Sequence, residues 1–214
     1  MKRAIFLDKD GTLVEDVPYN CDVRLIRLMP RLSEGLRRLQ AAGYLLVIVS
    51  NQAGVAHGKV SLEALASAEA TIRALLRDLQ IRLDGFYFCP HHPEGRVPVY
   101  ARSCDCRKPA PGLLRKAGLD GGIDLSASWM IGDILHDVEA GRRAGCRTIL
   151  LDNGHETEWL LGAHRVPHHM ATDLDSAADI VLAEDQGARM PTTEEGRVPD
   201  AARHDDRDGV RYAG

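Results

Sequence analysis

Two aspartates near the start of the chain have the chemistry needed to act on a phosphate ester. Asp8 and Asp10 directly follow an apolar run at residues 4–7. Such a run predicts a buried strand, and open α/β sheets bind their ligands at the carboxyl ends of strands. One carboxylate can attack phosphorus to form an aspartyl phosphate, and a second can carry the proton. Because Asp-Gly is also an ordinary turn sequence, further groups are needed to favour catalysis over a turn.

Two polar segments farther along the chain could hold a phosphate group. Residues 50–52, Ser-Asn-Gln, follow a second apolar run, so a hydroxyl and amides there can bind phosphate oxygens. Arg107 and Lys108 precede a proline, which disfavours a helix and presents two cations in an extended segment. Taken singly, the first segment is typical of a capped turn and the second of a solvated surface pair.

A further segment predicts a magnesium site. Asp133 comes just after the apolar run 129–131, and Asp137 lies four residues later, on the same side of a predicted helix. Mg²⁺ prefers one or two carboxylates together with water and substrate phosphate, although acidic residues are also common at helix N-termini. All of these segments follow predicted strands or their loops. They can therefore meet at one edge of a sheet, and this agreement favours a phosphate-handling site.

Residues 89–106 contain the ligands of a structural zinc site. Cys89, Cys104 and Cys106 supply three thiolates, and either His91 or His92 supplies an imidazole. This set suits tetrahedral Zn²⁺ in a closed site. The loop between the ligands holds charges, Gly and Pro but no useful core, so a metal would order it where packing cannot. In the alternative interpretation, the three cysteines are ordinary buried thiols that bind no metal.

Alternating strand-like and helix-like segments predict an α/β fold. The strands are continuously apolar, which is typical of a three-layer, Rossmann-like, mostly parallel sheet with helices on both faces. We expect one domain over residues 1–185, with the loop 89–106 as an insert, and a polar, disordered tail over 186–214. The predicted strands are 3–8, 45–49, 86–88, 129–131, 148–151 and 179–182, and the predicted helices are 30–42, 61–79, 111–117 and 134–144.

The composition is that of an ordinary globular protein. Hydrophobic residues make up 44% and charged residues 27% of the 214-residue chain, which allows a sizeable core. The net charge of -4 disfavours a general nucleic-acid or membrane surface. No apolar stretch reaches the length of a membrane span, and the N-terminus lacks a signal-peptide pattern. We therefore expect a cytoplasmic monomer without nucleic-acid or membrane partners.

The phosphate-handling segments together resemble the four motifs of the haloacid dehalogenase-like (HAD) phosphatases. The match spans residues 3 to about 152. The cysteine-rich loop that runs into Arg107 and Lys108 is similar to the zinc loop of D-glycero-D-manno-heptose 1,7-bisphosphate 7-phosphatases, and related histidinol-phosphate phosphatases carry it too. The resemblance implies a Mg²⁺-dependent phosphomonoesterase that removes the 7-phosphate of this heptose bisphosphate. It also implies a HAD-type fold without a large cap domain.

The resemblance assigns roles to individual residues. Asp8 would be the nucleophile and a Mg²⁺ ligand, and Asp10 the general acid and base, with its backbone carbonyl on the Mg²⁺. Asp133 would complete the Mg²⁺ site, and Asp137 would orient the groups around it. The phosphoryl group would be held by Ser50 and Lys108, and the rest of the substrate would contact Asp16, Tyr19, Asn51, Gln52, Ala53 and Arg107.

One departure concerns the substrate. The heptose enzymes typically have a lysine directly after the Gly-Asp of the last motif, where this chain has Ile134. Loss of that cation leaves the phosphatase chemistry intact, but it keeps histidinol phosphate or another small sugar phosphate as an alternative substrate.

Functions of other classes fit less well. The acidic charge disfavours a DNA 3′-phosphatase. The presence of both Asp8 and Asp10 disfavours an inactive, zinc-stabilised binding module. A mutase or phosphotransferase is also chemically possible, although small pocket loops favour hydrolysis. The histidines at 155, 164, 168 and 169 show no partner pattern, and we interpret them as surface or loop residues.

Overall fold

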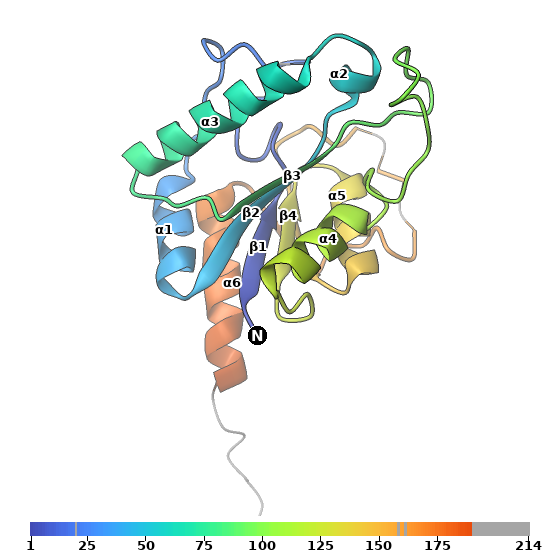
Figure 1. Ribbon diagram of the computed structural model, residues 1–214. Helices are drawn as coiled ribbons and strands as arrows, with labels where there is room; N and C mark the ends of the chain where they lie inside the picture. Colours follow the sequence, from blue (N-terminus) through green and yellow to red (C-terminus); the bar gives the residue numbers. More distant parts are fainter. Residues whose placement is uncertain (20, 158, 161, 190–214) are drawn as a thin grey trace, which may run out of the picture.

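Six strands form a single sheet in the computed structural model, which describes residues 1–19, 21–157, 159–160 and 162–189 (Figure 1). Their order is β3-β2-β1-β4-β5-β6, and every neighbouring pair is parallel. The predicted parallel α/β sheet is therefore confirmed. The strands are β1 Arg3–Leu7, β2 Tyr44–Asn51, β3 Gly85–Cys89, β4 Trp129–Gly132, β5 Arg147–Leu151 and β6 His169–Ala171.

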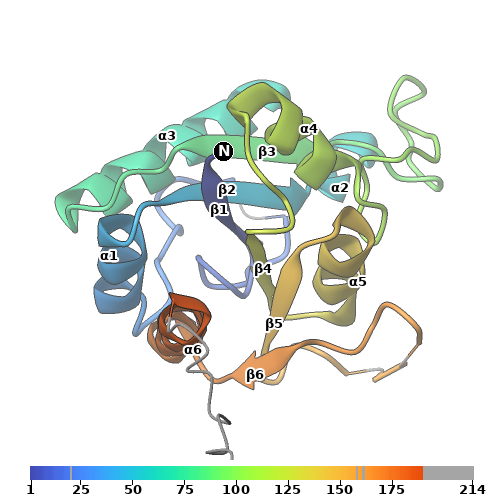
Figure 2. The ribbon, with the colours of Figure 1, turned by 90° about the horizontal axis from the view of Figure 1, so that it is seen from below.

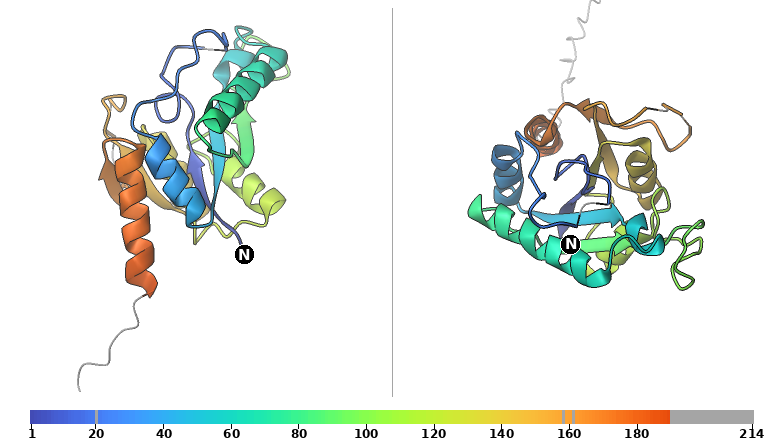
Figure 3. Two further views of the ribbon diagram at one scale, coloured as in Figure 1. Left: turned by 90° about the vertical axis from the view of Figure 1, so that its left-hand side faces the viewer. Right: turned by 90° about the horizontal axis from the view of Figure 1, so that it is seen from above.

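Helices cover both faces of the sheet. Two of them, α1 and α6, pack side by side and share a core with α3, whereas α4 and α5 pack on the opposite face. Figure 2 shows α4 and α5 across the strands from α1 and α6, and Figure 3 shows the α1–α6 pair from two sides. The helices are α1 Ser33–Ala41, α2 Ala53–Ala56, α3 Leu62–Asp78, α4 Gly112–Gly121, α5 Leu135–Ala144 and α6 Leu174–Arg189.

The central strand β1 explains why the sequence pattern is continuously apolar. Successive side chains of a strand point to opposite faces. Ile5 and Leu7 belong to the core under α1 and α6, and Ala4 and Phe6 belong to the core under α4. All four are fully or almost fully buried, so each face of the sheet demands apolar residues.

One predicted strand is wrong. Residues 179–182 lie inside helix α6, and the last strand is the short β6, which the sequence analysis did not predict. Four apolar residues recur at helical spacing in α6: Leu174, Ala177, Ala178 and Val181 are buried in the core shared with α1. A short run such as Asp179–Leu182 fits a strand or a helix locally, and packing on the core decides between them.

Helix α6 also continues past the domain boundary expected at residue 185, up to Arg189. Asp185 is tied to the sheet, because it accepts hydrogen bonds from Arg3 at 2.6 Å and from the Tyr44 hydroxyl at 2.9 Å. The remainder of the tail expected to be disordered, residues 190–214, lies outside the described residues. Among the residues that the structure describes, no helix is long and apolar enough to cross a membrane.

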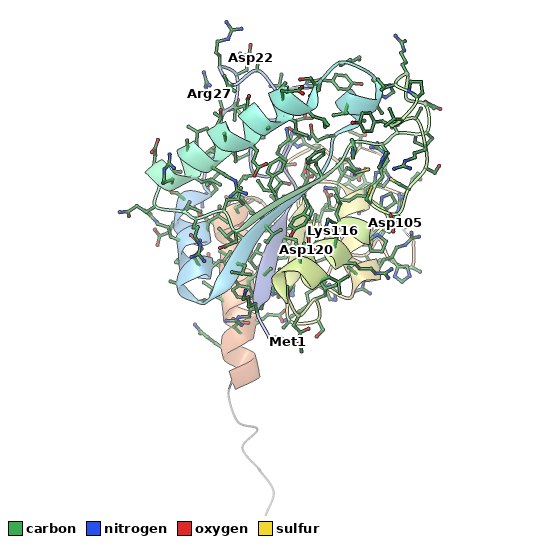
Figure 4. All side chains as sticks on the ribbon, viewed as in Figure 1. Met1, Asp22, Arg27, Asp105, Lys116 and Asp120 are labelled. Carbon is green, nitrogen blue, oxygen red and sulfur yellow. The ribbon has the colours of Figure 1, made fainter. Side chains whose placement is uncertain are left out.

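The carboxyl ends of the strands are bordered by loops. Figure 4 shows Met1 at the amino end of the sheet, and Asp22 and Arg27, from the loop between β1 and α1, at the opposite end. The loop between β3 and α4 borders the same edge (Figure 1). The described ranges contain no helices or strands beyond this sheet and the helices around it. Strand β1 is where the chain switches sides, since β2 and β3 lie on one side and β4 to β6 on the other. Such a switch point is the usual ligand crevice of open α/β sheets.

Candidate active site

The first aspartate lies at the carboxyl end of β1, in the crevice between β2 and β4. Asp8 is buried, and its backbone N–H donates to the Ile131 carbonyl of β4 at 3.0 Å. The chain then turns sharply at Gly11, whose φ of +80° is accessible to glycine at little cost. A Cβ atom there would lie 2.1 Å from a carboxylate oxygen of Asp133. Gly11 therefore lets the β1 loop approach the β4 loop closely.

Lys108 is the cation at the centre of the site. Its buried ammonium donates to the Asp8 carboxylate, to Asp137 Oδ1 at 2.6 Å and to the Val49 carbonyl at 2.8 Å. Burial alone would lower the pKa of Lys108, but the carboxylates of Asp137 and Asp8 raise it well above its usual range. The lysine is therefore permanently charged and aimed at Asp8.

Asp133 lies beside Asp8 in a cluster of carboxylates. Oxygens of Asp8, Asp133 and Asp137 all lie within 4.8 Å of one another. Burial and the neighbouring charge of Asp8 raise the pKa of Asp133 to about 6. The Thr12 hydroxyl donates to Asp133 Oδ1 at 2.9 Å. Three buried carboxylates around one lysine leave excess negative charge, which suits a bound cation.

The second aspartate of the β1 loop faces the end of β2. Asp10 accepts a hydrogen bond from the Gln52 amide at 3.2 Å, and it forms an ion pair with the Lys9 ammonium at 2.7 Å. The same Gln52 nitrogen donates to the Ser50 hydroxyl at 2.8 Å. Burial raises the pKa of Asp10, although Lys9 opposes the shift. A carboxyl group with a raised pKa is suited to donate a proton.

The polar residues at the end of β2 contact different parts of the site. Asn51 uses its amide on the backbone of Lys108, donating to the carbonyl and accepting from the N–H, both at 3.0 Å. It therefore positions the backbone of Lys108, and the expected contact of Asn51 with substrate stays a prediction. Ser50 and Gln52 are buried beside Asp10, and Ala53 is the first residue of α2.

The loop after β1 supplies the other expected substrate contacts. Asp16 and Tyr19 are both exposed. The Tyr19 ring packs against α2, where a Cβ on Gly54 would lie 3.0 Å from it, and the Lys59 ammonium lies 3.8 Å from the ring centre. Tyr19 thus has a defined place at the rim of the site.

The four expected zinc ligands converge at the end of β3. The sulfur of Cys106 lies 3.2 Å from those of Cys89 and Cys104, and the Cys89 and Cys104 sulfurs are 3.5 Å apart. Two thiolates on one tetrahedral zinc would be about 3.8 Å apart. His91 Nδ1 lies 3.3 Å from the Cys106 sulfur.

The choice between the two histidines is decided by their side-chain directions. His91 belongs to the Cys/His group, whereas His92 Nδ1 accepts from the Glu94 backbone N–H at 3.1 Å, and its ring lies 4.8 Å from that of His57. His92 therefore points away from the thiols. The geometry assigns the imidazole of the cluster to His91.

Comparison with known proteins agrees with this geometry. A family model described as HAD-hydrolase-like matches residues 105–177. The chain is 42% identical over 155 residues to the D-glycero-beta-D-manno-heptose-1,7-bisphosphate 7-phosphatase of Pasteurella multocida, covering 72% of this chain and 84% of the relative. It is 38% identical over 184 residues to the D-glycero-D-manno-heptose-1,7-bisphosphate 7-phosphatase of Chlorobaculum tepidum, covering 82% and 92%. The chain belongs to the HAD-like phosphatase family.

Solved structures support the same assignment. The D,D-heptose 1,7-bisphosphate phosphatase of B. bronchiseptica, complexed with magnesium and phosphate, is 28% identical with a TM-score of 0.73, and the match covers 86% of this chain and 99% of that one. This chain is thus a phosphatase of the HAD superfamily. Its carboxylate cluster and its Cys/His cluster are two groups that could hold metal ions.

A segment after β5 that was not singled out from the sequence also contacts the carboxylate cluster. Asn153 donates to the Gly11 carbonyl at 2.7 Å, His155 Nδ1 lies 2.7 Å from Asp133 Oδ2, and Glu156 accepts from the Leu135 backbone N–H at 2.6 Å. These residues follow β5, and a polar run after a strand is the signal that marked the other segments. His155 is an exposed loop residue, as interpreted from the sequence, and its contact with Asp133 is a partner that the sequence pattern did not show.

Two other histidines have partners in the structure. His168 accepts a hydrogen bond from the Thr148 backbone N–H at 2.9 Å. His169 pairs with Glu184 of α6, and its ring lies 5.9 Å from that of Trp129. His168 is exposed and lies outside the strands, as interpreted from the sequence, whereas His169 is a half-buried residue of β6.

Proposed function

We propose that this phosphatase removes the 7-phosphate of D-glycero-D-manno-heptose 1,7-bisphosphate through an aspartyl phosphate on Asp8. The observation that carries the chemistry is the contact of the Lys108 ammonium with the buried Asp8 carboxylate, beside Asp133. Relatives that are 42% and 38% identical to this chain are heptose-1,7-bisphosphate 7-phosphatases, which supports this substrate.

The first step is an in-line attack by Asp8. A carboxylate oxygen of Asp8 forms a bond to phosphorus, and the bond from phosphorus to the sugar oxygen breaks. Lys108 and the Ser50 hydroxyl bind the equatorial phosphoryl oxygens and offset their charge. Because Asn51 holds the backbone of Lys108, the ammonium is positioned before the substrate arrives.

Asp10 handles the proton in both steps. Its protonated carboxyl group donates to the leaving sugar oxygen in the first step. As a carboxylate it then takes a proton from water, whose oxygen attacks the phosphorus of the aspartyl phosphate and frees Asp8. The hydrogen bond from Gln52 orients Asp10, and its raised pKa allows it to start protonated.

The carboxylate cluster fits Mg²⁺. Side-chain oxygens of Asp8 and Asp133 and the backbone carbonyl of Asp10 would hold the ion. Asp137 pairs with the Lys108 ammonium at 2.6 Å, so it would hold the lysine beside the metal site. When bound, Mg²⁺ supplies positive charge that stabilises the transferring phosphoryl group.

The Cys/His cluster fits structural Zn²⁺, because Cys89, His91, Cys104 and Cys106 would fill all four positions. Arg102 now donates toward His91 Nε2 at 3.0 Å. With a metal on Nδ1, the Nε2 atom of His91 would carry a proton and could not accept from Arg102. The exposed Arg102 side chain would therefore turn away. A bound zinc would hold the loop that carries Arg107 and Lys108.

A substrate panel tests the proposed activity. We expect Mg²⁺-dependent phosphate release to be fastest with the heptose 1,7-bisphosphate, and phosphorus NMR of the product should show that the 1-phosphate remains. The panel should include both anomers, histidinol phosphate and simple sugar phosphates. A higher kcat/KM for histidinol phosphate would replace the heptose assignment by the alternative.

A substitution of the proton carrier should separate the two steps. Asp10→Asn should lower kcat for a sugar phosphate by about 10²- to 10⁴-fold, because the amide cannot donate or accept the proton. With p-nitrophenyl phosphate, whose leaving group needs no proton, the variant should still release one burst of nitrophenolate per enzyme and then stall. Asp120→Asn, an exposed change on α4, is the control. Equal loss with both esters and no burst would contradict this role.

A further inference from the structure

A short segment after β5 bridges the two loops that carry the carboxylates of the site. This segment, residues 153–156, follows β5 at the carboxyl end of the sheet. On one side, Asn153 donates to the Gly11 carbonyl of the loop after β1 at 2.7 Å. On the other side, Glu156 accepts from the backbone N–H of Leu135 at the start of α5, at 2.6 Å. The segment therefore connects the loop after β1 to the loop after β4.

His155 is the residue of this segment that reaches the carboxylate cluster. Its Nδ1 atom lies 2.7 Å from Asp133 Oδ2. Its ring also lies against Gly11, where an added Cβ would be 2.3 Å from the same nitrogen. Between them in the chain, Gly154 has a φ of +90°, which glycine adopts at little cost. This turn lets Asn153 and His155 contact the same loop.

The carboxylate of Asp133 is held on both of its oxygens. Oδ1 accepts from the Thr12 hydroxyl at 2.9 Å, and Oδ2 faces Nδ1 of His155. Because an ionised carboxylate can only accept, Nδ1 carries the proton in this contact. The last torsion of an aspartate side chain has broad preferences, so hydrogen bonds rather than sterics fix its rotation. Thr12 and His155 together therefore determine where the oxygens of Asp133 point.

The free end of the Asn153 amide indicates that this segment serves the site and not only the fold. Its Oδ1 atom is buried and has no hydrogen-bond partner among the described residues, while its nitrogen is held by Gly11. A buried acceptor without a partner costs stability. Residues that break such a rule are typical of functional sites.

We propose that His155 is a positioning residue for the magnesium site, because its Nδ1–H holds the Asp133 carboxylate in the orientation that binds the ion. Asn153 holds the loop of Asp8 and Asp10 against the same carboxylate. Removal of a group that orients a metal ligand typically weakens metal binding about 10- to 100-fold. This inference rests on the proposed function, in which Asp133 is a Mg²⁺ ligand.

Binding of Mg²⁺ alone to the full-length protein, measured by isothermal titration calorimetry, tests this role without any substrate. His155→Ala should raise the dissociation constant of Mg²⁺ about 10- to 100-fold. His155→Asn should stay within about threefold of wild type, because its amide nitrogen is bonded to Cγ as Nδ1 is and keeps the donor. His155→Gln carries its amide one bond farther, near the position of Nε2, and should bind Mg²⁺ as weakly as His155→Ala.

Two further variants frame the result. His164→Ala changes an exposed histidine in the loop before β6 and should bind Mg²⁺ as wild type does. Asp133→Asn should abolish binding, because it removes a ligand of the ion. The melting temperature without Mg²⁺ and the zinc content of each variant, compared with wild type, show that a change in Mg²⁺ binding is not a loss of the fold.

The outcomes separate this role from the magnesium site itself. If Asp133→Asn abolishes binding but His155→Ala leaves it unchanged, the role of His155 is overturned and the magnesium site stands. Tighter binding in His155→Ala would show that the imidazole competes with the ion, which also overturns the role. Equal binding by the Asn and Gln variants would exclude a contact through Nδ1. If wild type binds no Mg²⁺, or Asp133→Asn binds it equally well, the proposed magnesium site fails and the role of His155 fails with it.

Discussion

Asp8→Asn should lower phosphate release at least about 10⁴-fold while the protein still folds. The amide has the shape of the carboxylate but lacks the nucleophilic oxygen, so no aspartyl phosphate can form. The melting temperature should equal or exceed that of wild type, because the change removes one of three crowded negative charges while Asp137 still pairs with Lys108. Steady-state phosphate release and thermal melting measure the two effects.

A chemical readout distinguishes a lost nucleophile from a disturbed site. Acid-quenched wild-type enzyme should contain phosphate on the peptide that includes Asp8, and the variant should contain none. Asp120→Asn makes the same chemical change at an exposed aspartate on α4 and should behave as wild type. Turnover of Asp8→Asn within tenfold of wild type would remove Asp8 from the nucleophile position.

Cys106→Ser should remove zinc and lower stability by roughly 10 °C in melting temperature. The wild-type chain should hold about one zinc, and a structural site of this kind contributes several kcal/mol to folding. Activity should fall as well, because the released loop carries Arg107 and Lys108. Elemental analysis, thermal melting and phosphate release measure the three effects.

The matched control is Cys21→Ser, which changes a half-buried cysteine outside the cluster and should keep the zinc. Zinc supplied to metal-stripped wild type should restore the melting temperature, but it should not restore that of Cys106→Ser. Wild-type protein that is purified without zinc and is fully active would contradict a structural metal at this loop.

Most of the fold could be predicted from residues 1–152 because local pattern and tertiary packing agree there. A strand buried on both faces must be apolar throughout. The amphipathic helix α3 follows Ser61, an N-cap whose side chain accepts a hydrogen bond from the Ala64 N–H at 3.1 Å. The pattern failed at 179–182, where three consecutive apolar residues after Asp179 have no period of their own and the core shared with α1 selects a helix.

The chemical groups available to the site could be read from the residues alone: two aspartates after β1, a lysine before a proline, carboxylates after β4, and three cysteines with a histidine. Parallel strands end at one edge, so polar residues after each strand had to gather there. Which of them touch was decided only by strand order and side-chain direction. The β4–β5 register aligns Gly132 with Leu150, which brings His155 onto Asp133 across 22 residues. Likewise, His91 and His92 are neighbours in the chain, and only the fold turns one toward the thiols and the other away.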